Sequence, residues 1–208
     1  MKFTATSNGG TPIDFECGDT VTSRCDAILQ GKTYPFLPFV EDVRVVFDVG
    51  ANCGAASVHF ARHYPDAEVH AFEPGSDARG FLQRNVARYA NVHVHEISLD
   101  AINQWTAEHS IERIDVLKLA VARAEVFVLE SLAALLPTVK LLYVEYGSRQ
   151  IRRDVAGLVD PTHELYAGVM FLDQGECVYL GRDLVDLGAA VDHLKQSFMS
   201  ARIASQPA

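Results

Sequence analysis

Two acidic residues stand where apolar, strand-like stretches of the sequence end. The stretch VVFDVGANCGAAS (residues 45–57) carries Asp48 near the end of its apolar run and then turns through glycine into small helix-forming residues. Glu73 ends the next apolar stretch, AEVHAFEP, about twenty residues beyond the turn, where a carboxylate accepts hydrogen bonds from ribose hydroxyls in nucleotide-binding folds. This arrangement predicts a nucleoside site.

The turn itself, G-A-N-C-G, restricts which nucleotide could bind. Gly50 allows the chain to turn tightly after the strand, and Gly54 allows the helix to approach closely. The spacing differs from GxGxxG, and no lysine closes a GxxxxGK[ST] loop, so neither phosphate-binding motif is present. Asn52 stands where a pyrophosphate needs bare backbone, and Asp48 would repel a phosphate but suits a cationic group. S-adenosylmethionine, a nucleoside with a sulfonium and no phosphate, fits this site; the alternative is a turn that serves packing alone.

Composition excludes several classes of protein. The chain has 208 residues, 49% of them hydrophobic, which suits one compact domain. A net charge of −9 argues against nucleic acid as the main partner. No apolar run is long enough to span a membrane, and the N-terminus has no apolar signal core, so we expect a cytoplasmic protein without a membrane partner. The four cysteines form no CxxC pair, which favours reduced thiols over disulfides and predicts no metal site.

Strand-like and helical patterns alternate from residue 43 onward and end in a hairpin-like pair, 163–171 and 175–181. This order predicts an α/β fold with a doubly wound, mainly parallel sheet and a C-terminal antiparallel hairpin, with ligands bound at the carboxyl ends of the strands. We expect residues 1–40 to pack on a core domain of residues 41–200, and residues 201–208 to form a loose tail. A helix is expected over 124–136.

The motifs FDVGANCG, AFEP followed by FLQRN, and LDAINQW…IERIDVLKL…AE resemble the FkbM-type methyltransferases, from about Ile28 to Glu145. The resemblance implies a class I, Rossmann-like methyltransferase fold with S-adenosylmethionine as cofactor, and methyl transfer to hydroxyls of sugars or secondary metabolites. It also implies that the cofactor is surrounded by these residues: Asp48, Gly50, Asn52 and Gly54 at the methionine and ribose, Glu73 of the FEP motif with Pro74 at the ribose hydroxyls, and Tyr34 near the mouth of the site.

Two segments depart from the family pattern. The loop that carries adenine contacts is very short here, so Ser98 and its neighbours would have to replace it in part. The family pattern LKxDVEGAE is LKLAVARAE in this chain, with Ala120 and Ala122 in place of acids and Arg123 in place of glycine. Either positioning of the substrate drives the reaction without an acid here, or the chain is an inactive methyltransferase-fold domain that serves as a cofactor-binding or partner subunit.

Three residues are predicted on the substrate side: Lys118, Glu145 and Tyr146. Glu145 ends the stretch LLYVEYG and is the expected general base or substrate contact, although an ion pair with Arg149 or Arg152 explains it equally well. His59 and His63 are one helical turn apart but have no evident third ligand, so we expect solvated helix histidines. The sequence therefore predicts an S-adenosylmethionine-dependent O-methyltransferase of a small molecule and leaves a homo-oligomer open; the GxxxG spacing disfavours a nicotinamide dehydrogenase.

Overall fold

A central sheet organises the molecule, for which the computed structural model describes residues 1–6 and 10–204, with side chains as far as residue 197. Seven strands form this sheet in the order β5-β4-β3-β6-β7-β9-β8. Their bounds are β3 (Val45–Val49), β4 (Glu68–Phe72), β5 (Val92–His95), β6 (Val116–Leu119), β7 (Leu141–Tyr146), β8 (His163–Phe171) and β9 (Gln174–Gly181). The order reverses between β3 and β6, which is where doubly wound folds bind ligands.

The strands from β5 to β7 are parallel, whereas β9 pairs antiparallel with β7 and β8 pairs antiparallel with β9. Parallel strands covered on both faces are rich in apolar residues. β3 and β6 are apolar except for Asp48 and Lys118. Val46, Phe47 and Leu117 are fully buried in them. The predicted α/β fold class, with its C-terminal antiparallel hairpin, is confirmed.

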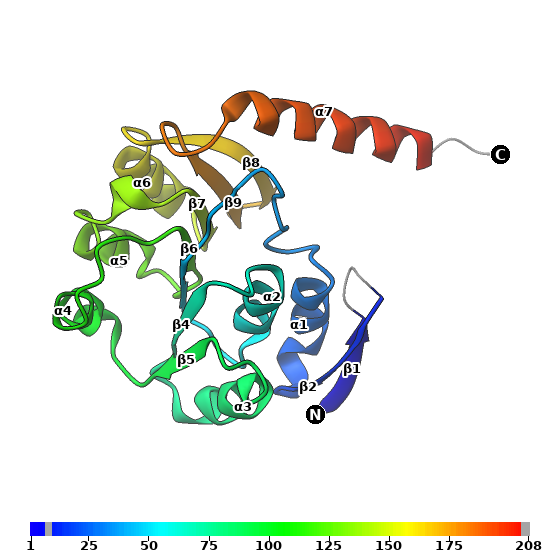
Figure 1. Cartoon of the computed structure of the whole chain (residues 1–208), viewed down its shortest axis with the longest axis vertical. Coiled ribbons are helices and arrows are strands. Elements are labelled where there is room, and N and C mark those ends of the chain that lie inside the picture. Colours follow the sequence, from blue (N-terminus) through cyan, green and yellow to red (C-terminus); the bar gives the residue numbers. More distant parts are fainter. Residues whose placement is uncertain (7–9, 205–208) are drawn as a thin grey trace.

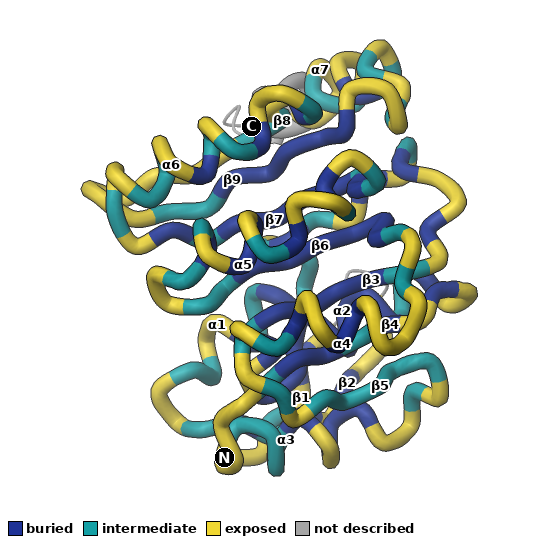
Figure 2. Tube along the Cα trace, turned by 90° about the vertical axis from the view of Figure 1, so that its left-hand side faces the viewer, coloured by how far each residue is buried: buried dark blue, intermediate teal, exposed yellow. Residues whose placement is uncertain are grey.

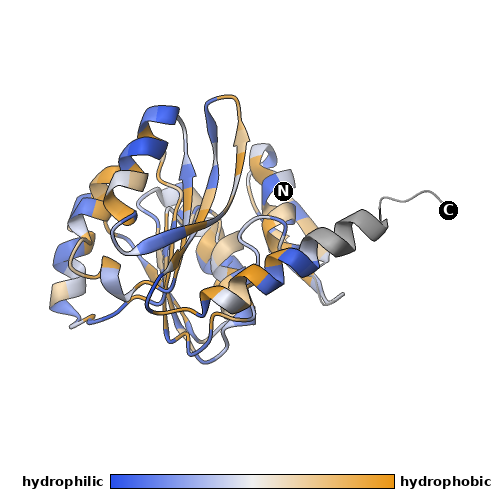
Figure 3. Ribbon diagram, turned by 90° about the horizontal axis from the view of Figure 1, so that it is seen from above, coloured by the Kyte–Doolittle hydropathy of each residue, from blue (hydrophilic) through white to orange (hydrophobic). Residues whose placement is uncertain are grey.

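Helices cover both faces of the sheet (Figure 1). One face carries α1 (Thr22–Leu29), α2 (Ala55–His63) and α3 (Ser76–Val86), and the other carries α4 (Ile102–Glu108), α5 (Glu125–Ser131) and α6 (Arg149–Val159). Two separate clusters of buried apolar side chains lie between the sheet and these layers. The strands at the centre are buried and the outward helix faces are exposed (Figure 2). Figure 3 shows apolar and polar residues mixed along the helices, and among the exposed residues Phe171 and Leu172 are apolar.

The N-terminal segment has more regular structure than its mixed sequence indicated. It forms a hairpin of β1 (Lys2–Thr6) and β2 (Pro12–Glu16), followed by α1. The Asn85 side chain fastens this segment to the core, because it accepts a hydrogen bond from Glu16 N at 2.9 Å and donates to Glu16 O at 2.7 Å and Cys53 O at 2.8 Å. Asn85 therefore links the N-terminal segment to the turn after β3.

Some helix bounds differ from those expected. Helix α5 ends at Ser131 rather than continuing to 136, and a 3-10 turn follows at Leu136–Thr138, with Pro137 inside it. Helix α7 (Leu187–Ala204) includes the first four residues of the predicted loose tail, and 205–208 lie outside the described residues. In the part of the chain that the structure describes, no helix is both long and apolar enough to cross a membrane.

Candidate functional site

The turn after β3 has a backbone that only particular residues tolerate. Its φ angles are +75° at Gly50, +50° at Asn52 and +88° at Gly54. A Cβ on Gly50 would lie 2.2 Å from the backbone oxygen of Ala120, and one on Gly54 would lie 2.6 Å from a methyl group of Leu82. Both glycines are therefore required for close packing as well as for the left-handed conformation.

Asp48 and Lys118 form a buried ion pair beneath the turn. Their side chains face each other from neighbouring positions of β3 and β6, with Lys118 Nζ 2.9 Å from Asp48 Oδ1. Ser57 Oγ donates to Asp48 Oδ2 at 2.6 Å, and Lys118 Nζ donates to the Gly50 carbonyl at 2.7 Å. Because Asp48 is completely buried, its charge is balanced by Lys118 within the protein.

Glu73 lies at the rim of the turn and holds its backbone. One carboxylate oxygen accepts from Asn52 N and the other from Gly75 N, both at 2.8 Å. Pro74, which follows, is exposed, and its carbonyl accepts from Arg79 Nη1 at 2.8 Å. The turn and the end of β4 thus meet at a partly exposed carboxylate.

The connection after β5 is as short as its sequence indicated. Only residues 96–98 separate β5 from the 3-10 turn at Leu99–Ala101, and Ser98 is exposed at its start. Glu96 pairs with Arg79 at 2.5 Å, beside the Glu73 and Pro74 carbonyls that Arg79 also contacts. This ion pair occupies the side of the rim where an adenine-contacting loop is expected.

Two neighbouring cavities open at the carboxyl edge of the sheet. The smaller, about 160 Å³, is lined by the turn residues Gly50 and Asn52 and by Tyr34 and Lys118. The larger, about 560 Å³, lies between the ends of β6 and β7 and the β8–β9 hairpin. Arg24, Ala120 and Glu145 line both cavities, so the two meet at these side chains.

Glu145 lies where the cavities meet, but its partners differ from those expected. It accepts a hydrogen bond from the Tyr34 hydroxyl and forms an ion pair with Arg24, which is also 3.4 Å from Glu176. Arg149 instead pairs with Asp173 at 2.8 Å, so the expected Glu145 pair with the helix after β7 is not formed through that residue. Burial raises the pKa of Glu145 above its ordinary value, although Arg24 opposes the shift.

The segment after β6 forms one wall of the larger cavity. Ala120, Ala122 and Tyr146 line it, and the φ angles of +48° at Ala122 and +88° at Arg123 are unfavourable for residues with a Cβ. Glu125, also at this wall, is almost completely buried, and its Oε2 has no hydrogen-bond partner among the described residues. An unpaired buried carboxylate oxygen is costly, which makes it a natural contact for a ligand group that donates a hydrogen bond.

The structure thus brings most of the predicted residues to one edge of the sheet. Tyr34, Gly50, Asn52 and Lys118 line the smaller cavity, and Tyr146 lines the larger one; Glu73, Pro74 and Ser98 lie along the rim or near it. Sequence reasoning missed Arg24 and Glu176, because nothing in one sequence indicates that α1 and the hairpin approach Glu145. Glu125 is the last residue of the motif LKLAVARAE, but the sequence assigned it no role.

The histidines on α2 also differ from the expectation. His59 is 2% exposed, so it is buried rather than solvated, and its Nδ1 has no hydrogen-bond partner among the described residues. Its ring lies against His63, with centroids 4.3 Å apart. Burial lowers the pKa of His59 to about 3, so this side chain is neutral.

Comparisons with known proteins support the fold. No family model matches the chain, so the resemblance to FkbM-type enzymes remains a prediction. The chain is 34% identical over 61 residues to ribosomal RNA small subunit methyltransferase G 1 of Bdellovibrio bacteriovorus, a match covering 29% of this chain and 30% of that protein. It is 50% identical over 46 residues to the AMB antimetabolite synthetase AmbE of Pseudomonas aeruginosa, covering 22% of this chain and 2% of that protein. The matches thus span less than a third of either curated relative.

A solved structure extends the likeness to most of the chain. Aeropyrum pernix fibrillarin with natively bound S-adenosyl-L-methionine superimposes with a TM-score of 0.57 at 15% identity, covering 86% of this chain and 94% of that one. The chain therefore has the class I methyltransferase fold, and the predicted cofactor, S-adenosylmethionine, is the one bound in that structure. Its substrate is a separate question.

Proposed function

We propose that the protein is an S-adenosylmethionine-dependent methyltransferase that methylates a hydroxyl group of a small molecule. The observation that carries the proposal is the meeting of the two cavities at Arg24, Ala120 and Glu145. One cavity touches the turn that would hold the cofactor, and the other offers an acceptor site next to a carboxylate. Methyl transfer requires this juxtaposition of two ligands.

The smaller cavity fits only part of the cofactor, because about 160 Å³ is well below the ~300–1,000 Å³ of a typical ligand pocket. We assign the methionine portion to this cavity, beside Gly50, Asn52 and Tyr34. The ribose then lies at the rim against Glu73, with Pro74 and Ser98 toward the adenine. Asp48 supports the turn through Lys118 rather than touching the ligand.

The larger cavity would hold the acceptor. When bound, the cofactor supplies an electrophilic methyl group on a positively charged sulfur. Glu145 accepts the proton of the attacking hydroxyl, and its raised pKa makes it a better base than an ordinary glutamate. Glu125 Oε2 accepts a hydrogen bond that orients the acceptor, while Arg24 holds the Glu145 carboxylate toward it.

A small acceptor is favoured over RNA, although one curated relative is named as an RNA methyltransferase. The net charge of −9 opposes binding to a phosphate backbone. The larger cavity also carries three carboxylates, from Glu125, Glu145 and Glu176, against two cations, Arg24 and Lys32. An acceptor with several hydroxyls and no phosphate suits these groups.

The alternative is an inactive domain that binds the cofactor or a partner protein. The observation that favours it is the pair of alanines, Ala120 and Ala122, at the cavity wall, because neither can accept a proton. Calorimetry with S-adenosylhomocysteine and a methyl-transfer assay with sugars, phenolic metabolites and ribosomal RNA separate these functions. We expect saturable binding and transfer to a hydroxyl compound.

Variants of the protein test the roles of individual residues in the transfer assay. Glu145→Gln should lower the rate of transfer by about 10²-fold or more, whereas Glu164→Gln, on the exposed side of β8, should leave it unchanged. Absence of binding at millimolar ligand would exclude the enzyme and leave the partner subunit. Binding without transfer in the wild type, followed by transfer after Ala120→Asp, would identify a domain that has lost activity, and transfer to RNA alone would overturn the small-molecule proposal.

A further inference from the structure

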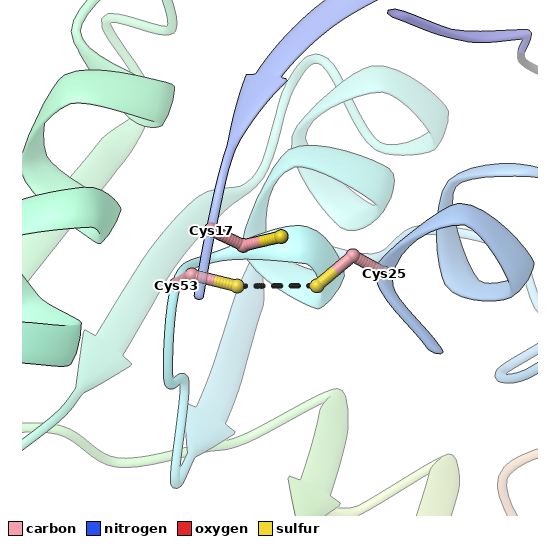
Figure 4. A group of neighbouring side chains, drawn as sticks. All are labelled: Cys17, Cys25 and Cys53. Atoms are coloured by element: carbon pink, nitrogen blue, oxygen red, sulfur yellow. Dashed lines mark hydrogen bonds between the residues drawn. The ribbon is translucent and has the colours of Figure 1, made fainter. Parts of the chain in front are cut away.

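Three of the four cysteines, which the sequence disperses, gather at the turn after β3 (Figure 4). Cys17 follows β2, Cys25 is on α1, and Cys53 is within the turn between Asn52 and Gly54. All three are at most 3% exposed, and their sulfur atoms lie within 4.8 Å of one another. This cysteine cluster lies between the N-terminal segment and the turn that would bind the cofactor.

Cys25 and Cys53 are the closest pair of the three. Their sulfur atoms are 3.2 Å apart and share a hydrogen bond. A disulfide needs a separation of about 2.05 Å, so the sulfurs have to approach by only about 1.2 Å more. Cys17 Sγ contacts Thr22 Oγ1 at 3.5 Å and also interacts with the Cys25 thiol, less strongly than Cys53 does.

The backbone N–H groups of the turn favour the thiolate of Cys53, which we therefore assign as the nucleophile of the pair. The hydrogen bond from the Cys25 thiol lowers the pKa of Cys53, and backbone N–H groups of Cys53 and Ala55 add to this effect, while burial and Asp48 oppose it. The same hydrogen bond, together with burial, raises the pKa of Cys25. Both residues line the smaller cavity, which gives a molecule as small as hydrogen peroxide a route to the sulfurs.

We propose that Cys25 and Cys53 are a modification site: a dithiol that a peroxide converts into a disulfide between α1 and the cofactor turn. The Cys53 thiolate attacks one peroxide oxygen, the O–O bond breaks, and Cys53 becomes a sulfenic acid with release of hydroxide. The Cys25 sulfur then attacks the Cys53 sulfur and displaces the hydroxyl, and the thiol protons convert both oxygens to water. Two thiols and one peroxide thus give one disulfide and two waters.

A metal site fits the cluster less well. Structural zinc has four ligands at tetrahedral corners, and thiolates about 2.3 Å from one ion are roughly 3.8 Å apart. Among the described residues the cluster supplies three ligands, and its closest pair is nearer than that, at 3.2 Å. Direct sulfur–sulfur chemistry suits the observed geometry better.

Mass spectrometry of the full-length protein tests the proposal. After treatment with hydrogen peroxide, the wild type should lose about 2 Da, and proteolysis without reduction should give one linked peptide pair containing Cys25 and Cys53. Cys17→Ser and Cys177→Ser should form the same link. Cys25→Ser combined with Cys17→Ser should instead gain about 16 Da or more at Cys53, because neither neighbouring thiol is left to resolve the sulfenic acid.

Four results would overturn the proposal: no mass loss in the wild type, a link that includes Cys17, faster oxidation of Cys25 in Cys17→Ser/Cys53→Ser than of Cys53 in Cys17→Ser/Cys25→Ser, or a bound thiophilic metal that protects the thiols. Intact mass and elemental analysis of the untreated protein detect the last of these. Circular dichroism confirms that each serine variant is folded.

The bridge would also affect the turn, and this consequence rests on the proposed function. Pulling Cys53 toward α1 displaces its neighbour Asn52, so we expect S-adenosylhomocysteine to bind at least about tenfold more weakly to the oxidised protein, reversibly with a thiol reductant. Unchanged affinity after complete bridging would overturn this consequence alone. If the reduced protein does not bind the ligand, the proposed function fails, and the mass measurements still decide whether the bridge forms.

Discussion

The ammonium of Lys118 lies 2.9 Å from the carboxylate of Asp48, and both side chains are at most 5% exposed. Lys118 also donates to the Gly50 carbonyl, so one cation joins two strand ends and the turn between β3 and α2. Removing one member of a buried pair leaves the other charge without compensation. The geometry of the turn therefore depends on a residue of another strand.

We expect Lys118→Met to lower the free energy of unfolding by about 3–5 kcal/mol, measured by urea denaturation. Adding Asp48→Asn should restore part of the loss, because the neutral amide still accepts the hydrogen bond from Ser57. The control is Lys195→Met, which removes a member of an exposed pair with Asp192 and should cost at most about 1 kcal/mol. An equally small effect for Lys118→Met would show that the buried pair does not stabilise the fold.

Arg123→Gly should raise the free energy of unfolding by about 1 kcal/mol. Arg123 is exposed and has a left-handed backbone conformation, which is unfavourable by about that amount for any residue with a Cβ and is free of this strain for glycine. The matched control is Arg153→Gly in the middle of α6, where glycine should destabilise by about 1 kcal/mol. Thermal and urea unfolding measure both. The interpretation is wrong if both substitutions change the free energy of unfolding in the same direction.

Stability should fall as the pH decreases below 6.5, the ordinary pKa of histidine, because His59 is neutral in the folded protein and is protonated more readily when unfolded. Each pH unit between 6.5 and about 3 should remove about 1.4 kcal/mol through this residue. His59→Leu should reduce this slope, measured by urea denaturation from pH 7 to pH 4.5. His70 and His95, whose pKa values burial lowers to about 4, keep part of the slope in the variant. Identical slopes would contradict a buried neutral His59.

Glu73→Ala should weaken binding of S-adenosylhomocysteine by about tenfold or more, because the variant loses the proposed ribose contact and the hydrogen bond to the Asn52 backbone. Glu68→Ala is the control, since this exposed glutamate lies at the opposite end of β4 and pairs with His93. Calorimetry measures both affinities. Equal affinities in the two variants would place the ribose elsewhere.

The order of apolar, helical and glycine-containing stretches in the sequence predicted the parts of the fold that depend on neighbouring residues. Continuous apolar runs separated by helical stretches have few arrangements other than a covered parallel sheet, and the glycines at 50 and 54 indicated a turn that excludes phosphate. Helix ends were less predictable. The apolar pattern continues beyond Ser131, where α5 ends, so periodicity alone does not mark that end.

Only the tertiary structure decided which side chains meet. Asp48 looked like a ligand for a cation, but burial next to Lys118 gives it an internal partner. For Glu145 the sequence left open an ion pair with the helix that follows its strand, but Arg24 and Tyr34 contact it from the N-terminal segment. Cys25 and Cys53 are 28 positions apart and in contact. Such contacts arise because the sheet brings distant strand ends and helices to one edge. Spacing along the chain does not predict which residues meet there.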